Sequence, residues 1–207
     1  MISVERIATI LAEYELTAPR PLCEKLHAYI ELLLRWNERV ALTTITDPEE
    51  IVREHFAESF LAAKYVDLQI GRLADVGSGA GFPGLALKIY CESLDVTLIE
   101  PIQKKTAFLH EASRVVGANK VEVQKKRFQE IPPTLKFNFI TSRALGQFED
   151  LLGWSKTVLN PDGIAILWIG EASVTETKKS HLDWTWRDPF HLPHTKNRYI
   201  LAGSPKP

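Results

Sequence analysis

The sequence predicts an α/β fold in which a mostly parallel sheet, with helices on both faces, follows an N-terminal helical extension. Three observations support this prediction. Apolar residues recur at helical spacing over residues 1–66, strands alternate with helices from Arg72 onward, and a glycine-rich loop joins the first strand to its helix. We therefore expect a helical extension over 1–66 that packs on a core over 67–207.

The N-terminal extension contains three helical segments. The first carries apolar residues at helical spacing, namely Ile7, Ile10, Leu11 and Tyr14. Pro19 and Pro21 interrupt this pattern, and a second amphipathic stretch follows. The third segment has a clear start, because Asp47 can cap the helix, Pro48 suits its first position and Glu50 lies three residues after the cap.

The core alternates between strands and helices. The predicted strands cover residues 72–76, 95–100, 120–124, 137–142 and 163–169, with a last, antiparallel strand over 198–203. The predicted helices are Leu85–Tyr90, Lys104–Val116 and Phe148–Val158. The tail after Gly170 is polar and then aromatic, with Trp184, Trp186 and Phe190.

The composition is that of a globular protein, with 45% hydrophobic and 25% charged residues. The net charge of −1 means that any contact with nucleic acid must come from a local basic patch. Cys23 and Cys91 have neither metal-ligand spacing nor the spacing of a redox pair, so we expect buried, helical cysteines and no metal site.

The first residues lack the uninterrupted apolar stretch of a signal peptide, since Glu5 and Glu13 fall within their pattern. No segment approaches the roughly 20 apolar residues that cross a bilayer. We therefore expect a cytoplasmic protein with no membrane contact.

The glycine loop carries the most specific functional signal. Gly79-Ala-Gly81-Phe-Pro-Gly84 matches G-x-G-x-x-G, so an NAD(P)-type dinucleotide-binding oxidoreductase is one interpretation. Asp75, however, precedes Gly77 by two residues and completes the D-x-G-x-G signature of class I S-adenosylmethionine-dependent methyltransferases. A carboxylate there can brace the loop and the cationic methionine end of that cofactor, whereas it would sit poorly beside a pyrophosphate. A purely structural turn carboxylate is an equally good interpretation of Asp75.

Glu100 ends the next predicted strand, where a carboxylate can accept hydrogen bonds from both ribose hydroxyls of a nucleoside cofactor. Both S-adenosylmethionine and NAD have such a ribose, so Glu100 does not distinguish them. A solvated charge at the strand end is the alternative. Together with Asp75, the loop favours S-adenosylmethionine and predicts a seven-stranded, Rossmann-like class I methyltransferase.

The acceptor side is predicted at the end of the fourth strand, Thr141-Ser-Arg-Ala144. It lacks the N-P-P-Y type tetrapeptide that exocyclic-amine methyltransferases typically carry, and no cysteine nucleophile for methylation at carbon lies near it. An atom such as guanine N7 already has a lone pair and needs no general base, so orientation suffices. Arg143 is the predicted catalytic residue, able to stack on the base or donate to it; a plain surface ion pair is the alternative.

A local basic patch does occur. Residues 104–127 contain seven basic side chains against two acidic ones; the basic residues are Lys104, Lys105, Arg114, Lys120, Lys125, Lys126 and Arg127. Two groups, Lys104–Lys105 and Lys125–Arg127, follow the ends of strands and suit phosphate contacts beside the active site. A solvated surface, or a non-enzymatic RNA-binding module, remains the alternative to an enzyme that binds RNA.

Several segments together resemble the bacterial small-subunit rRNA guanine-N7 methyltransferase family, RsmG (also called GidB). The resemblance spans about residues 25–170 and is carried by 32–56, 74–87, Glu100 with Lys104-Lys105 and Phe108-Leu109, 127–130 and 142–144. It implies that the chain methylates N7 of a guanine in the 530 loop of 16S rRNA, within the assembled small subunit. We expect a monomer.

The resemblance also implies site residues. Gly77 and Phe82 would line the cofactor pocket beside Asp75 and Gly79, and Glu100 would hold the ribose. It further implies that Phe128 and Gln129 border the adenine and that Arg143 lies between cofactor and target. Contact with RNA is implied for Lys104, Lys105 and Arg127.

Some positions depart from the family's usual pattern. Glu54 and Glu58 stand where Arg and Asp are usual, and Ala41 stands where Asn is usual. The fifth strand ends in Ile169-Gly170 rather than Lys-Gly, so one expected cation is missing. His55 is expected to be a hydrogen-bonded core histidine, while Trp36 should pack between helices and Asn37 should bridge to a loop.

Overall fold

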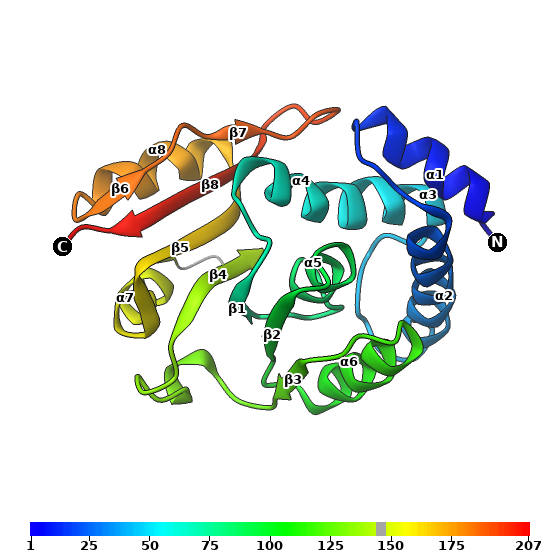
Figure 1. Ribbon diagram of the computed structural model, residues 1–207, viewed down its shortest axis with the longest axis horizontal. Helices are drawn as coiled ribbons and strands as arrows, with labels where there is room; N and C mark the ends of the chain where they lie inside the picture. Colours follow the sequence, from blue (N-terminus) through cyan, green and yellow to red (C-terminus); the bar gives the residue numbers. More distant parts are fainter. Residues whose placement is uncertain (144–147) are drawn as a thin grey trace.

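A central sheet separates two layers of helices in the computed structural model, which describes residues 1–143 and 148–207 (Figure 1). The strands are β1 (Gly71–Val76), β2 (Leu94–Ile99), β3 (Val121–Gln124), β4 (Phe137–Arg143), β5 (Leu159–Gly170), β6 (Trp184–Trp186), β7 (Phe190–His191) and β8 (Arg198–Pro205). Each central strand reads as a near-continuous apolar run because both faces of the sheet are covered.

The described strands form one sheet of eight strands. Seven follow the order β3-β2-β1-β4-β5-β8-β6, and the two-residue β7 pairs with β8 off this path. β3, β2, β1, β4 and β5 are parallel, whereas β8 is antiparallel to β5, as predicted for the last strand. The carboxyl ends of β1, β2, β3 and β4 therefore meet at one edge of the sheet, where α/β proteins bind their ligands.

Helices cover both faces of this sheet. Those of the core are α5 (Gly84–Tyr90), α6 (Gln103–Val115), α7 (Phe148–Val158) and α8 (Glu171–Ser180), with a short 3₁₀ turn η2 (Phe128–Glu130) after β3. The helices predicted over Leu85–Tyr90, Lys104–Val116 and Phe148–Val158 are confirmed to within one residue. None of the helices within residues 1–143 and 148–207 is both long and apolar enough to span a bilayer.

The N-terminal layer contains α1 (Val4–Glu13), α2 (Arg20–Asn37) and a continuous helical segment formed by α3 (Pro48–Glu50), the π-helix η1 (Ile51–Ala57) and α4 (Glu58–Tyr65). The predicted cap at Asp47 is confirmed, because its Oδ1 accepts from the backbone N–H groups of Glu49 and Glu50, each at 2.9 Å. The periodicity did not predict the π-helix. This rare geometry frequently occurs at functional sites.

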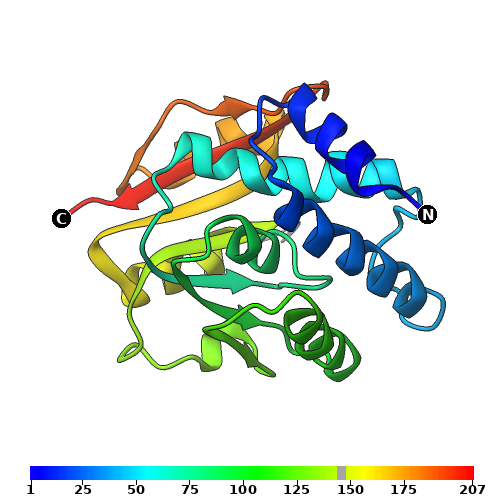
Figure 2. The same cartoon turned by 45° about the vertical axis from the view of Figure 1, so that its right-hand side comes forward.

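Two apolar clusters pack on opposite faces of the sheet. One joins α1, α2, η1 and α4 to α5 and α6, and in Figure 2 the N-terminal helices lie beside these core helices. The other packs α7 and α8 against the far face. Because the first cluster contains residues from both sides of position 66, the N-terminal helices form a layer of one packed unit, and the boundary between 1–66 and 67–207 remains a prediction.

Candidate active site

The glycine loop lies over the carboxyl ends of β1 and β2. The backbone N–H groups of Gly77 and Ser78 both donate to the Ile99 carbonyl, at 2.9 and 3.2 Å. Gly77 and Gly79 have φ angles of 73° and 53°, a region that side chains disfavour. Among the described residues, a Cβ at Gly79 would meet only the Gly77 carbonyl oxygen, at 3.7 Å, so these residues leave open space beside Gly79.

Asp75 braces this loop from within the protein. Its side chain is buried, and Oδ1 accepts a hydrogen bond of 2.8 Å from Thr141 on β4. Oδ2 has no hydrogen-bond partner among the described residues and lies against Gly84, the first residue of α5, where a Cβ would approach it to 2.7 Å. Burial raises the pKa of Asp75 to about 6, against the opposing hydrogen bond from Thr141. The structure thus supports a bracing role for Asp75, and its contact with a ligand remains a prediction.

Glu100 directly follows β2 and connects the loop to the next strand. Its buried carboxylate accepts from the Gly79 N–H at 3.0 Å and from the Ile102 N–H at 2.9 Å. Ile102 itself is 49% exposed, and it stands two residues after Glu100 at the carboxyl edge. We did not predict Ile102, although an apolar residue two positions after a strand-end carboxylate is the signal that could have indicated it.

Phe82 packs against the N-terminal helices. Its ring stacks on His55 of η1 at 4.6 Å and on Tyr29 of α2 at 5.5 Å, and it meets Phe56 edge-on at 5.0 Å. Tyr29 also donates a buried hydrogen bond of 2.7 Å to the Ala80 carbonyl inside the loop. The helical layer therefore holds the glycine loop in place, which makes Tyr29 a site residue that the sequence analysis missed.

His55 is a buried, hydrogen-bonded histidine, as expected. Its Nε2 lies 2.9 Å from Thr43 Oγ1, and Nδ1 has no partner among the described residues. Burial, together with the positive charge of Arg143, lowers the pKa of His55 to about 3. The imidazole is therefore neutral at neutral pH.

The predicted adenine-side residues follow β3 at the same edge. Phe128 is half-buried and meets Trp154 of α7 edge-on at 5.4 Å, whereas Gln129 is exposed. Both belong to η2, so the chain turns back toward the sheet at the position that the resemblance implies. Their contact with a cofactor remains a prediction.

Arg143 ends β4, next to the glycine loop, because its neighbour Ser142 pairs with Val76. Its Nη1 donates to the Glu54 carbonyl at 2.7 Å, and its Nη2 lies 3.4 Å from Glu58 Oε2. The arginine side chain is 19% exposed and the glutamate side chain 3%, so the alternative of a plain surface ion pair is wrong. Ala144, the last residue of the predicted acceptor segment, lies outside the described residues.

The seven cations of residues 104–127 do not form one patch. Lys104 and Lys105 begin α6 and Lys125–Arg127 follow β3, so these five lie near the carboxyl edge, all exposed except the half-buried Lys105. Lys120 precedes β3 and pairs with Asp95 at 3.1 Å, and Arg114 lies at the far end of α6. The direction of the strand and helix places the last two at the opposite edge, which corrects the larger cluster read from the sequence.

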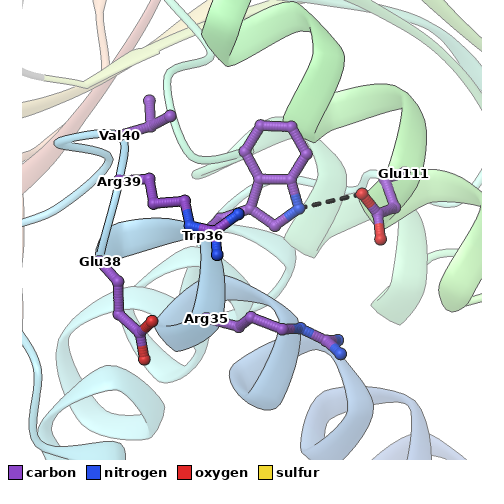
Figure 3. Close-up of a pocket in the computed structure, with 6 residues that line it drawn as sticks. All are labelled: Arg35, Trp36, Glu38, Arg39, Val40 and Glu111. Carbon is purple, nitrogen blue, oxygen red and sulfur yellow. Dashed lines mark hydrogen bonds between the residues drawn. The ribbon is translucent and has the colours of Figure 1, made fainter.

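Trp36 lines a separate pocket of about 400 Å³, shown in Figure 3, whose other lining residues are Arg35, Glu38, Arg39, Val40 and Glu111. The indole Nε1 donates to Glu111 of α6 at 2.9 Å, and the ring meets Phe108 edge-on at 5.8 Å. Asn37 holds the following loop through the backbone of Leu42 and Thr43. Packing by Trp36 and loop bridging by Asn37 are thereby confirmed.

The two cysteines differ in burial and in their position relative to a helix. Cys23 is buried in α2, as expected. Cys91 follows the last residue of α5 and is partly exposed, so its expected place inside a helix is wrong. Among the described residues no cluster of histidine, cysteine and acidic side chains is suited to hold a metal ion.

Solved structures share this fold. A methyltransferase that depends on S-adenosylmethionine from Aquifex aeolicus aligns with a TM-score of 0.60 at 20% identity, over 76% of this chain and 93% of that one. A ribosomal protein L11 methylase from Lactobacillus delbrueckii subsp. bulgaricus aligns with a TM-score of 0.62 at 18% identity, over 74% and 79%. The fold and the glycine loop together define the class I S-adenosylmethionine-dependent methyltransferase architecture.

The family model GidB, rRNA small subunit methyltransferase G, matches residues 22–198, and the chain belongs to this family. A ribosomal RNA small subunit methyltransferase G from Xylella fastidiosa (strain M23) is 40% identical over 136 residues, which cover 66% of this chain and 63% of that relative. A ribosomal RNA small subunit methyltransferase G from Halorhodospira halophila is 35% identical over 161 residues, which cover 78% of this chain and 76% of that relative. The chain thus spans somewhat less than two thirds of the Xylella relative.

Proposed function

We propose that this protein is an S-adenosylmethionine-dependent methyltransferase that modifies N7 of a guanine in the 530 loop of 16S rRNA, within the small ribosomal subunit. Membership of the GidB family supports the reaction and the RNA class. The observation that carries the proposal is geometric: the glycine loop, Glu100, Arg143 and five cations all lie at one edge of the sheet. A nucleoside cofactor and a polyanionic acceptor can meet there.

The residues at this edge fit the cofactor. The described residues leave open space beside Gly79; the Glu100 carboxylate would accept hydrogen bonds from a ribose, and the exposed Ile102 would pack against an adenine ring. When bound, the cofactor supplies an electrophilic methyl group on a sulfonium. The protein's part is to hold that group against the acceptor and to exclude water.

The same edge fits a dinucleotide poorly. In dinucleotide-binding folds the pyrophosphate lies at the N-terminus of the helix after the glycine loop. Here the buried carboxylate of Asp75 already lies against Gly84 at the start of α5. Repulsion between two anions therefore disfavours the oxidoreductase interpretation.

The acceptor chemistry requires orientation rather than proton removal. Guanine N7 attacks through its own lone pair, so no general base is needed. His55 is neutral at neutral pH, but guanine N7 carries no proton for it to accept. Arg143 is a cation at the end of β4 with donors for a base or phosphate, and Lys104, Lys105, Lys125, Lys126 and Arg127 would contact the RNA backbone.

We further propose that the protein acts as a monomer. A substrate within the small subunit would place the protein in the cytoplasm. Sedimentation of the purified protein tests the first point.

Methyl transfer to small subunits that lack the modification tests the function. We expect transfer of labelled methyl from S-adenosylmethionine to 30S subunits, with chemical strand scission mapping N7-methylguanine to the 530 loop. Naked 16S RNA is the matched substrate and should accept less. Transfer to another atom or another RNA would show that the family's substrate does not apply to this chain.

A further inference from the structure

A buried carboxylate lies between two arginines beside the acceptor side of the site. Glu58 begins α4, and its side chain is only 3% exposed. Its Oε2 lies 3.4 Å from Nη2 of Arg143, and its Oε1 lies 2.8 Å from Nη2 of Arg198 on β8. One carboxylate thus contacts the last residue of β4 and the first residue of β8.

The backbone around Glu58 is anchored to the same strands. The Glu58 carbonyl accepts from the indole Nε1 of Trp168 on β5, at 3.0 Å. One turn earlier, the Glu54 carbonyl accepts from Arg143 Nη1 at 2.7 Å, and the Glu54 carboxylate pairs with Arg198 at 2.9 Å. Three neighbouring strands, β4, β5 and β8, each contribute one side chain to the helical turn that contains Glu54 and Glu58.

Such a network is a costly way to stabilise a fold. Moving a carboxylate out of water costs several kcal/mol, and apolar side chains of similar volume often serve stability equally well. What the ion pairs do provide is a fixed position and direction for the guanidinium of Arg143. A guanidinium carries five N–H donors. Among the described residues, Arg143 donates one side-chain hydrogen bond, to the Glu54 carbonyl, and it forms an ion pair with Glu58.

We propose that Glu58 is a positioning residue that holds Arg143 at the acceptor side, with Arg198 balancing the buried charge. This inference rests on the proposed methyl transfer. It assigns to the N-terminal helical layer and the last strand a role in the active site, since both elements lie outside the cofactor-binding strands. Glu58 acts through Arg143 and itself contacts neither cofactor nor RNA.

Three variants separate positioning from general stability. Glu58→Gln removes the charge and should lower kcat for methylation of 30S subunits at least tenfold, which corresponds to about 1.4 kcal/mol. Its dissociation constant for S-adenosylmethionine should stay within threefold of the wild type, because the glycine loop and Glu100 are untouched. Glu58→Asp restores the charge and should return kcat to within threefold of the wild type. The matched control is Glu13→Gln, which removes an exposed carboxylate that pairs with Arg53 of η1 and should leave kcat unchanged.

A variant that removes one charge of each sign and leaves Arg143 charged covers the case in which Glu58→Gln does not fold. Glu58→Leu combined with Arg198→Leu replaces the pair by apolar side chains, a change that proteins often tolerate. It should show the same loss of kcat with cofactor affinity retained. Wild-type kcat in either folded variant, or equal losses in Glu58→Gln and Glu58→Asp, would overturn the positioning role. An inactive wild type would instead refute the proposed function, and the inference with it.

Discussion

A single methyl group added at Gly79 tests whether the glycine loop is the cofactor pocket. Gly79 has a φ of +53°, and a Cβ there would have no neighbour closer than 3.7 Å among the described residues. The variant Gly79→Ala therefore creates no clash with those residues. Its Cβ would instead occupy the open space in which the cofactor is expected to approach the backbone.

The expected magnitudes follow from this geometry. An L-residue in the left-handed region costs about 1–2 kcal/mol, so the free energy of unfolding should fall by about that amount. Cofactor affinity should fall at least tenfold, or about 1.4 kcal/mol, because a ligand in van der Waals contact with the Gly79 Cα cannot accept an extra methyl group. We therefore expect S-adenosylmethionine to bind at least tenfold more weakly to a protein that remains folded.

Gly117 offers a matched control. It also has a positive φ, +64°, and a Cβ there would meet nothing within 4 Å, but it follows α6 at the opposite edge of the sheet. Gly117→Ala should lose similar stability and keep normal affinity. Urea unfolding and calorimetric titration with S-adenosylmethionine measure the two quantities. Normal affinity in folded Gly79→Ala would show that the loop is not the pocket.

Three further predictions concern the RNA, the acceptor and the pH dependence of stability. Replacing Lys125, Lys126 and Arg127 by Gln should weaken RNA binding and make it less dependent on salt. The slope of log K against log salt concentration should become shallower by about 0.7–0.9 for each phosphate that the variant no longer neutralises. Arg143→Ala should slow single-turnover methylation of 30S subunits about a hundredfold or more, while cofactor affinity falls less than tenfold. His55 has a pKa lowered to about 3, so between about pH 6.5 and 4 the unfolded chain binds one proton more at this residue than the folded chain. As the pH falls through that range, the wild type should lose about 1.4 kcal/mol of stability per pH unit relative to His55→Gln, as measured by urea unfolding.

Each of these has its own control. Arg114→Gln with Lys120→Gln removes cations at the far edge and should leave the salt slope unchanged, whereas an unchanged slope in the Lys125–Arg127 variant would remove that segment from the interface. A wild-type rate per bound cofactor in Arg143→Ala would exclude contact with the acceptor. For His55 the stability of the wild type must be compared with that of His55→Gln. The raised pKa values of Glu58, about 7, and Asp75, about 6, make the folded protein gain stability as the pH falls below those values, which opposes the His55 effect. Parallel stability curves would mean that His55 is protonated in the folded protein.

The sequence predicted the parts of the fold that depend on neighbouring residues. Asp47 with Pro48 marks a helix start because a cap needs only backbone N–H groups two and three residues away. The central strands and the glycine loop were identified by apolar runs and glycine spacing, which are also local. The short strands β6 and β7 were not located, because two or three residues carry no period.

The candidate site was predicted where its residues lie at the ends of neighbouring strands. Asp75, Gly79 and Glu100 lie at the ends of two strands that pair in parallel, so a strand prediction places them together. Tyr29 and Ile102 were missed, the first because its hydrogen bond to Ala80 joins residues far apart in the chain. The π-helix η1 was missed because its hydrogen bonds differ from those of an α-helix by one residue, which the apolar pattern does not register.

The sequence by itself determined the glycine loop, the strand ends around it and the family to which the protein belongs. Only the tertiary structure decided that the seven cations divide between two edges and that Glu58 holds both Arg143 and Arg198. The reason is physical. Caps, turns and periodicity depend on residues a few positions apart, whereas an ion pair between η1–α4, β4 and β8 exists only after the sheet order has brought three distant segments together.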